Sequence, residues 1–196
     1  MRNVVRLAVV ACALATAGAV EASIGPVPTP IGRGALYHPR PRGPLVVGRR
    51  TVAGLRCARA GGPRFGVHLE LFGRGLVVLV PAGIGFAPPF QASDGFVSAG
   101  GCSYPVRTRE PTGVIETVRA TRATLGSFFA LWGQPLGPRR LAGFRAAGRE
   151  RVRAWVDGRL WRGDPRRIPL RPHAEIVLEL GRFVPPHAIY RFEKGL

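Results

Sequence analysis

The fold class is decided by the stretch Phe65-Gly-Val-His-Leu-Glu-Leu-Phe-Gly-Arg-Gly-Leu-Val-Val-Leu-Val80. In its first half, apolar side chains alternate with His68 and Glu70, and this period of two predicts a strand with one apolar face. The triplet Gly73-Arg-Gly75 then predicts a turn, and the apolar run that follows predicts a second strand. The stretch therefore predicts a β-hairpin at the centre of the domain.

One segment has helical rather than strand spacing. Its large apolar residues recur at intervals of three and four, at Leu125, Phe128, Phe129 and Trp132. Thr124 can cap the segment because its hydroxyl can accept from free N–H groups of the first turn, and Gly133 ends it. We expect one α-helix over about 124–132, packed on the sheet.

Further strands are expected over 113–118, 151–156, 159–161 and 174–180, while 87–101 is expected to be a loop and 134–148 a connector. Asp157-Gly158 is a strong hairpin signal, because both turn residues must accept positive φ. In the last strand, Glu175 and Glu179 lie opposite the apolar face, and we expect a surface charge ladder with Arg151 and Arg153. The predicted fold class is α+β: a mainly antiparallel sheet with one packed helix, in a single domain.

The N-terminus has the composition of a secretory signal peptide. Arg2 and Arg6 precede an apolar run that ends at Val20-Glu-Ala22, with small residues at positions −3 and −1. The run of about 14 residues is shorter than the roughly 20 that a transmembrane helix needs. The predicted organisation is a signal peptide over 1–22, a Pro/Gly-rich spacer over 23–44 and one β-rich domain over 45–196. An uncleaved membrane anchor is the main alternative, and a lipoprotein signal ending at Cys12 is a weaker one.

Cleavage after residue 22 would leave Cys57 and Cys102 as the two cysteines of the exported chain. Two cysteines in an oxidising compartment most simply form one disulfide. No C-x-x-C motif points to a reactive thiol. We expect a Cys57–Cys102 bond in a secreted or periplasmic protein.

The chain is strongly basic, with 29 Lys and Arg against 11 Asp and Glu and a formal net charge of +18. Two interpretations are open. The arginines could bind polyanions, because guanidinium groups attract phosphate and carboxylate surfaces. Alternatively, an arginine-rich and lysine-poor composition could reflect coding bias in a GC-rich genome. In either case the charge predicts adhesion to anionic envelope polymers, with no specific nucleic-acid partner.

No standard catalytic motif is present. The sequence lacks G-x-S-x-G, H-E-x-x-H and a glycine-rich loop that opens a helix with a lysine. Nothing in the spacing of Glu70, Glu110 and Glu116 requires a glycosidase carboxylate pair. The four histidines lie in separate segments, unlike the close spacing of most metal sites. We therefore expect no catalytic residues, no enzymatic activity and no cofactor.

Several of these segments together resemble a group of small exported bacterial proteins. The resemblance covers roughly residues 55–192 and includes a T-L-G-x-F-F-x-x-W-G-Q-P-L helix, here Thr124–Leu136. It also includes a V-P-A-x-I-G-I stretch, here Val80–Phe86, and a G-x-P-R-x-I-P-L-x-x-H stretch, here Gly163–His173. The relatives carry an L-H-T-H-D-x-x-G-x-I-H run whose clustered histidines look like a transition-metal site.

This chain departs from the group at those histidines. Arg107 and Arg109 occupy the H-x-H positions, Glu116 replaces the next histidine, and Arg64 lies before the strand that keeps His68. An arginine has no lone pair for a metal and adds positive charge where the cation would lie. The resemblance therefore implies a scaffold that has lost its histidine cluster. We expect Arg64, Arg107 and Arg109 to contact anions, and we expect no metal.

These observations predict an exported, non-catalytic binding or structural module of unknown ligand. Two alternatives remain open. One is a secreted Cu/Zn-binding protein or metalloenzyme that uses His68 and Glu116, and the other is an envelope protein tethered by its N-terminal segment.

Overall fold

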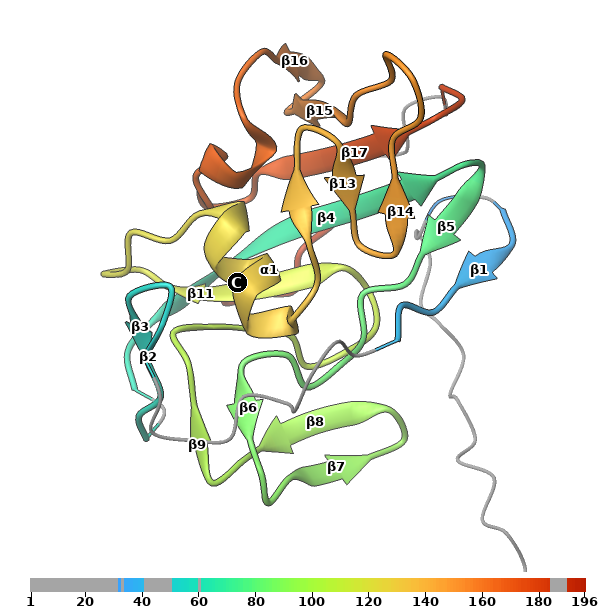
Figure 1. Cartoon of the computed structure of the whole chain (residues 1–196). Coiled ribbons are helices and arrows are strands. Elements are labelled where there is room, and N and C mark those ends of the chain that lie inside the picture. The colour runs from blue at the N-terminus through green and yellow to red at the C-terminus, as the bar shows by residue number, and fades with distance from the viewer. Residues whose placement is uncertain (1–31, 33, 41–50, 60, 184–189) are drawn as a thin grey trace, which may run out of the picture.

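The structure is a computed structural model that describes residues 32, 34–40, 51–59, 61–183 and 190–196. The predicted signal peptide and most of the predicted spacer lie outside the described residues, so both stay predictions. The described chain forms one helix, α1 (Leu125–Trp132), and a strand-rich body around it (Figure 1). The fold class is α+β in a single domain, as the sequence predicted.

The predicted hairpin lies at the centre of the largest sheet. β4 (Arg64–Gly73) pairs antiparallel with β5 (Leu76–Val78), and Arg74-Gly75 make the turn with positive φ at both residues. Figure 1 shows β4 as the long strand that crosses the molecule. The sheet has the order β1-β5-β4-β17-β15-β16, and β11 pairs with β4 and β10. Its other strands are β1 (Leu36–Tyr37), β10 (Val106–Arg107), β11 (Val114–Val118), β15 (Arg153–Val156), β16 (Arg159–Trp161) and β17 (Glu175–Leu180).

Most pairs of this sheet are antiparallel, but β17 runs parallel to β4 and β1 runs parallel to β5. The Asp157-Gly158 hairpin joins β15 to β16 as predicted. Smaller sheets surround the large one. They contain β2 (Thr51–Val52), β3 (Leu55–Arg56), β6 (Phe86–Ala87), β7 (Gln91–Ser93), β8 (Phe96–Ala99), β9 (Cys102–Ser103), β12 (Leu136–Gly137), β13 (Arg140–Leu141) and β14 (Phe144–Arg145), and a short 3-10 helix spans Pro165–Arg167.

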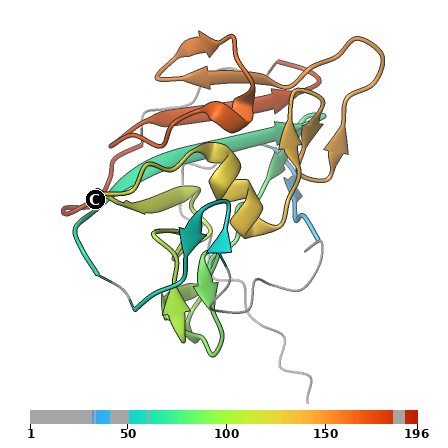
Figure 2. The ribbon, with the colours of Figure 1, turned by 60° about the vertical axis from the view of Figure 1, so that its left-hand side comes forward.

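The helix packs on one face of the large sheet (Figure 2). Thr124 caps it as predicted, since its hydroxyl accepts from the Ser127 N–H, and Gly133 ends it in the left-handed conformation. The buried helix residues Leu125, Phe128 and Phe129 belong to the same hydrophobic core as the odd-numbered apolar residues of β4. Burying such side chains stabilises the fold by about 1.5–3 kcal/mol each.

Three segments are more ordered than the sequence predicted. Within the predicted spacer, β1 hydrogen-bonds to β5, and Tyr37 packs on Phe144 with ring centroids 4.6 Å apart. Residues 34–40 therefore belong to the folded domain, whereas the sequence placed them in the spacer. The predicted loop 87–101 contains the β7–β8 hairpin, and the predicted connector 134–148 contains the β12–β14 sheet. These strands are two to four residues long, too short to show a period in the sequence.

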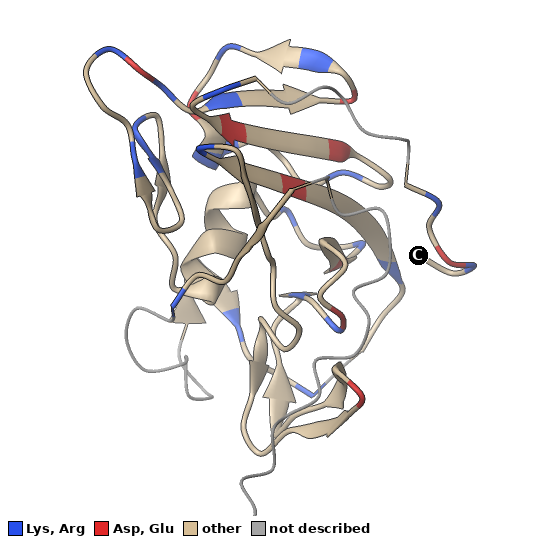
Figure 3. Cartoon of the chain, turned by 90° about the vertical axis from the view of Figure 1, so that its right-hand side faces the viewer, with Lys and Arg blue, Asp and Glu red and all other residues tan. Residues whose placement is uncertain are grey.

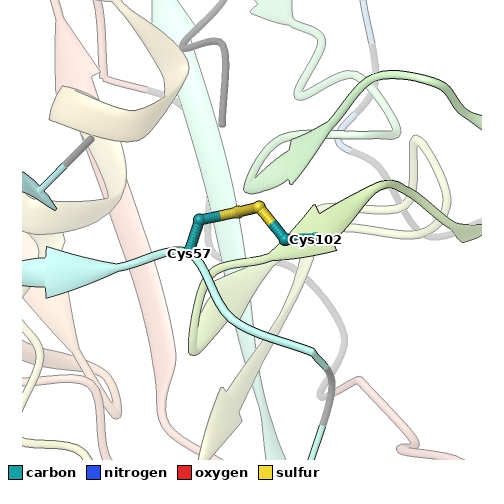
Figure 4. Close-up of a disulfide and its surroundings, with 2 residues drawn as sticks. All are labelled: Cys57 and Cys102. Carbon is teal, nitrogen blue, oxygen red and sulfur yellow. A yellow bond between two sulfur atoms is a disulfide. The ribbon is translucent and has the colours of Figure 1, made fainter. Parts of the chain in front are cut away.

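The Cys57–Cys102 disulfide is present as predicted, with the two Cα atoms 5.6 Å apart (Figure 4). It joins the segment after β3 to β9, across a sequence separation of 45 residues. Disulfides persist in oxidising compartments, so the bond fits a location outside the cytoplasm.

The second face of β4 is polar, and residues 190–196 cover part of it. His68 stacks on Tyr190 with ring centroids 4.4 Å apart, and Phe192 lies against the bare backbone of Gly66. His173 stacks on Phe192 and lies within hydrogen-bond distance of the Leu196 carbonyl oxygen. This second face holds the residues that the sequence selected as candidates.

Candidate functional site

The candidate residues come together because three strands are in register. Glu116 of β11 lies opposite Gly66 of β4 and opposite Arg107 of β10. Side chains alternate across a sheet, so Glu116 and His68 point to the same face, away from α1. Arg64, two residues before Gly66, shares that face.

The centre of the site is a buried ion cluster of Arg107, Glu116 and Arg109. Arg107 Nε donates to Glu116 Oε2 at 2.8 Å, and Arg109 Nε lies 3.0 Å from Glu116 Oε1. Arg107 is 4% exposed and Glu116 8%. The Arg107 guanidinium also lies over the Phe86 ring, 5.0 Å from its centroid. One carboxylate therefore holds two guanidinium groups, and one of these is inside the protein.

Arg64 lies beside this cluster and donates to the Pro105 carbonyl oxygen at 3.0 Å. Burial, and then the positive charge of Arg107, lower the pKa of the Arg64 guanidinium to about 10. The group remains charged at neutral pH, and loss of contact with water lowers its pKa more than the neighbouring guanidinium groups do.

This geometry bears on the three arginines that are predicted to contact anions. The structure brings Arg64, Arg107 and Arg109 together. However, Arg107 is buried, and Glu116 contacts both Arg107 and Arg109. A polymer in solution cannot reach Arg107 without breaking the cluster. Arg64 and Arg109 remain partly exposed, so anion contact at these two residues stays a prediction. The single charge of Glu116 can compensate only one of the two guanidinium groups that it contacts.

His68 lies in a second group of polar side chains on the same face. Its Nδ1 atom is 3.0 Å from Glu175 Oε2 and 3.9 Å from Glu70 Oε1. Glu175 also accepts from the Tyr190 N–H at 3.0 Å, so it connects β17 to the C-terminal segment. Burial, and next the Glu175 carboxylate, raise the pKa of Glu70 to about 8. Burial likewise raises the pKa of Tyr190.

The predicted charge ladder on β17 is only partly present. Arg153 lies opposite Glu179 and the two side chains are 3.2 Å apart, as expected. However, Glu179 is buried, and Glu175 contacts His68 instead of an arginine. The period-two pattern correctly placed Glu175 and Glu179 on the same face of β17. That face is not an open surface, because Glu179 is buried and Glu175 contacts His68 and Tyr190.

His68 and Glu116, the residues that the alternative Cu/Zn-binding function would use, have other partners in the structure. Both oxygens of Glu116 face guanidinium groups, whose charge opposes a cation, and His68 Nδ1 faces Glu175. Across the described ranges, no three His, Cys, Asp or Glu side chains are grouped so as to hold a metal ion. A cavity of about 140 Å³ lies beside the cluster and is lined by Arg109, Glu110, Glu193 and Tyr190, among others.

A separate basic surface lies on the small β12–β14 sheet, and sequence reasoning missed it. Arg140 and Arg145 are exposed and lie directly opposite each other on β13 and β14. The basic hairpin patch is defined by these two residues and their basic neighbours, which are Arg74, Arg139, Arg149 and Arg151. Figure 3 shows this charge on the small sheet and on the adjoining loop. The composition of residues 139–151 could have indicated this basic surface, because the segment contains five arginines and one acidic residue.

Comparisons with known proteins add no relative: no family model, curated protein or solved structure matches the chain. Within the described part of the chain, no helix has the length and apolar character needed to cross a membrane.

Proposed function

We propose that the protein is an extracytoplasmic, non-catalytic module that binds anionic polymers of the cell envelope through the basic hairpin patch. The observation that carries this proposal is the direct opposition of Arg140 and Arg145 across β13 and β14. Like charges in this position are destabilising, by up to about 1 kcal/mol relative to neutral pairs. An anion between the two guanidinium groups would remove that repulsion.

The charge of the patch is largely uncompensated. Its six guanidinium groups face one described carboxylate, Glu150, which pairs with Arg74 at 3.0 Å. Arg139 donates to the carbonyl oxygens of Ala146, Gly148 and Glu150, which orders the loop but leaves the positive charge in place. Among the described residues, Arg140 and Arg145 have no ion pair. The patch is therefore an ordered, net positive surface.

Two further features support the proposal. The chain as a whole has a net charge of +18, which speeds its encounter with negatively charged surfaces. The disulfide and the signal-like N-terminus fit export to a compartment that contains such polymers. Secretion or periplasmic residence is part of this proposal.

Heparin affinity chromatography with a salt gradient tests the proposal, with heparin as a defined sulfated polysaccharide. R140Q/R145Q should elute at clearly lower salt than the wild type and show a weaker dependence of binding on salt, because fewer counterions are released. R162Q/R167Q removes the same charge from exposed arginines on another surface and is the matched control. If both double variants shift elution equally, the net charge binds heparin and the patch has no special role.

A further inference from the structure

A second exposed surface differs in chemistry from the basic hairpin patch. Leu160 and Phe183 are 53% and 52% exposed, and both are large apolar residues. Trp155, partly exposed, lies between them. Exposed single apolar residues are common, but a connected group of them marks an interaction site.

The three side chains form one continuous platform. Leu160 of β16 lies directly opposite Trp155 of β15, so both side chains are on one face of the sheet. The Phe183 ring lies 6.1 Å from the Trp155 ring. Arg153 lies over both rings and donates to the Gly181 carbonyl oxygen, which fixes the position of the chain just before Phe183. We call Trp155, Leu160 and Phe183 the apolar platform.

Two cationic side chains lie beside the apolar platform: Arg153 lies over its two rings, and the exposed Arg182 precedes Phe183 in the sequence. Arg153 is partly neutralised by Glu179, and Asp157 at the hairpin turn is an acidic neighbour that accepts from the Glu175 N–H. The attraction of this surface to anions therefore rests on the net charge of +18 of the whole chain. A second copy of this chain is a poor occupant, because two chains of net charge +18 repel each other.

The geometry points to an anionic lipid surface as the partner of the apolar platform. Leu160, Trp155 and Phe183 would enter the interface between headgroups and acyl chains, where aromatic and aliphatic side chains are favoured. Arg153 and Arg182 would contact lipid phosphates. The two aromatic rings are tilted by 60° to each other, so they do not make the flat surface on which a sugar chain would stack. This inference concerns a surface distinct from the basic hairpin patch and does not depend on polymer binding.

The expected effects follow from area and charge. Transfer of the exposed halves of Leu160 and Phe183 out of water should contribute a factor of about 10–100 to vesicle partitioning. Each arginine near an anionic surface contributes roughly a further fivefold at moderate ionic strength. The apolar contribution should persist in high salt, while the charge contribution should decrease.

Co-sedimentation with vesicles tests the inference, with the full chain in every case so that the N-terminal segment contributes equally. The wild type should bind mixed phosphatidylcholine/phosphatidylglycerol vesicles more tightly than phosphatidylcholine vesicles. L160S/F183S should lose at least about tenfold in partition coefficient. The matched control is L36S/F90S, which removes two apolar residues of similar exposure elsewhere and should retain partitioning. Thermal unfolding of each variant confirms folding, and the single variant L160S replaces the double variant if that one does not fold.

Three outcomes would overturn the inference. Equal losses in the two double variants would mean that general hydrophobicity is responsible, and no loss in L160S/F183S would mean that the platform does not touch lipid. A wild-type dimer in analytical ultracentrifugation that L160S/F183S dissociates, with vesicle binding unchanged, would assign the platform to a second copy. R140Q/R145Q separates this result from the proposed function, because it should weaken heparin binding while the salt-resistant part of vesicle binding remains.

Discussion

Replacement of Glu116 by Gln should strongly destabilise the protein. The variant keeps the size of the side chain but removes the carboxylate that holds Arg107 and Arg109. Arg107 is 4% exposed and cannot turn into solvent without opening the site, so its charge would remain buried and uncompensated. Removal of one partner from a buried ion pair costs about 3–5 kcal/mol. Arg109 is partly exposed and adds little, because it can reach water.

Urea denaturation at neutral pH measures this effect directly, and thermal unfolding provides a second measurement. For a chain of this size, about 3–5 kcal/mol corresponds to a decrease in Tm of roughly 6–20 °C. The matched control is E193Q, which makes the same chemical change at an exposed glutamate lining the neighbouring cavity. Its effect should stay within about 0.5 kcal/mol, as for most surface substitutions.

A double variant distinguishes two causes of a lower stability: an uncompensated buried charge and a loss of side-chain packing. R107M/E116M removes both charges and fills the space with apolar side chains, so it should be more stable than E116Q. The reasoning would be refuted if E116Q cost less than about 1 kcal/mol, or if the double variant were the less stable of the two. Either result would mean that water reaches Arg107 and that the cluster is an ordinary surface ion pair.

Three further predictions concern stability elsewhere in the fold. The pKa of Glu70 is raised from 4.5 to about 8, so the folded state holds an extra proton between these values and stability should fall as pH rises through this window. E70Q should flatten that dependence in urea titrations at a series of pH values, and an unchanged slope would contradict the assignment. C57S/C102S should lower the free energy of unfolding by up to about 4 kcal/mol, for a loop closed over 45 residues, as measured against the oxidised wild type in urea. G85A should destabilise far more than G54A, although both glycines have φ of +78°, because an added Cβ would meet a backbone carbonyl at Gly85 and open space at Gly54. Equal Tm values for these two variants would show that the backbone relaxes around Gly85.

The predictable part of the fold consists of its longest periodic segments. The alternation in β4 and β17, the Asp157-Gly158 turn and the helix with its Thr124 cap are all local patterns, and all are present. The β7–β8 hairpin and the β12–β14 sheet were missed. Their strands are short, and long-range packing decides their conformation rather than a local period.

The candidate site was predicted as a set of residues but not as an arrangement. In the structure, the register of β4, β10 and β11 brings Arg64, Arg107 and Glu116 to one face, and Arg109 contacts Glu116. The sequence did not reveal that Glu116 neutralises Arg107. A sequence shows that a side chain is charged but not how far it lies from solvent, because burial depends on how the chain packs.

The sequence by itself determined the strand-rich domain, its single capped helix, the cysteine pair and the excess of arginine, because each depends on local spacing or on composition. Only the tertiary structure decided which arginines are available to a partner. Packing leaves Arg107 only 4% exposed, beside the Phe86 ring and Glu116. The β13–β14 hairpin instead holds Arg140 and Arg145 opposite each other on the exposed surface. The physical reason is that the free energy of a charge depends on its distance from water and from other charges, and the folded chain sets both distances.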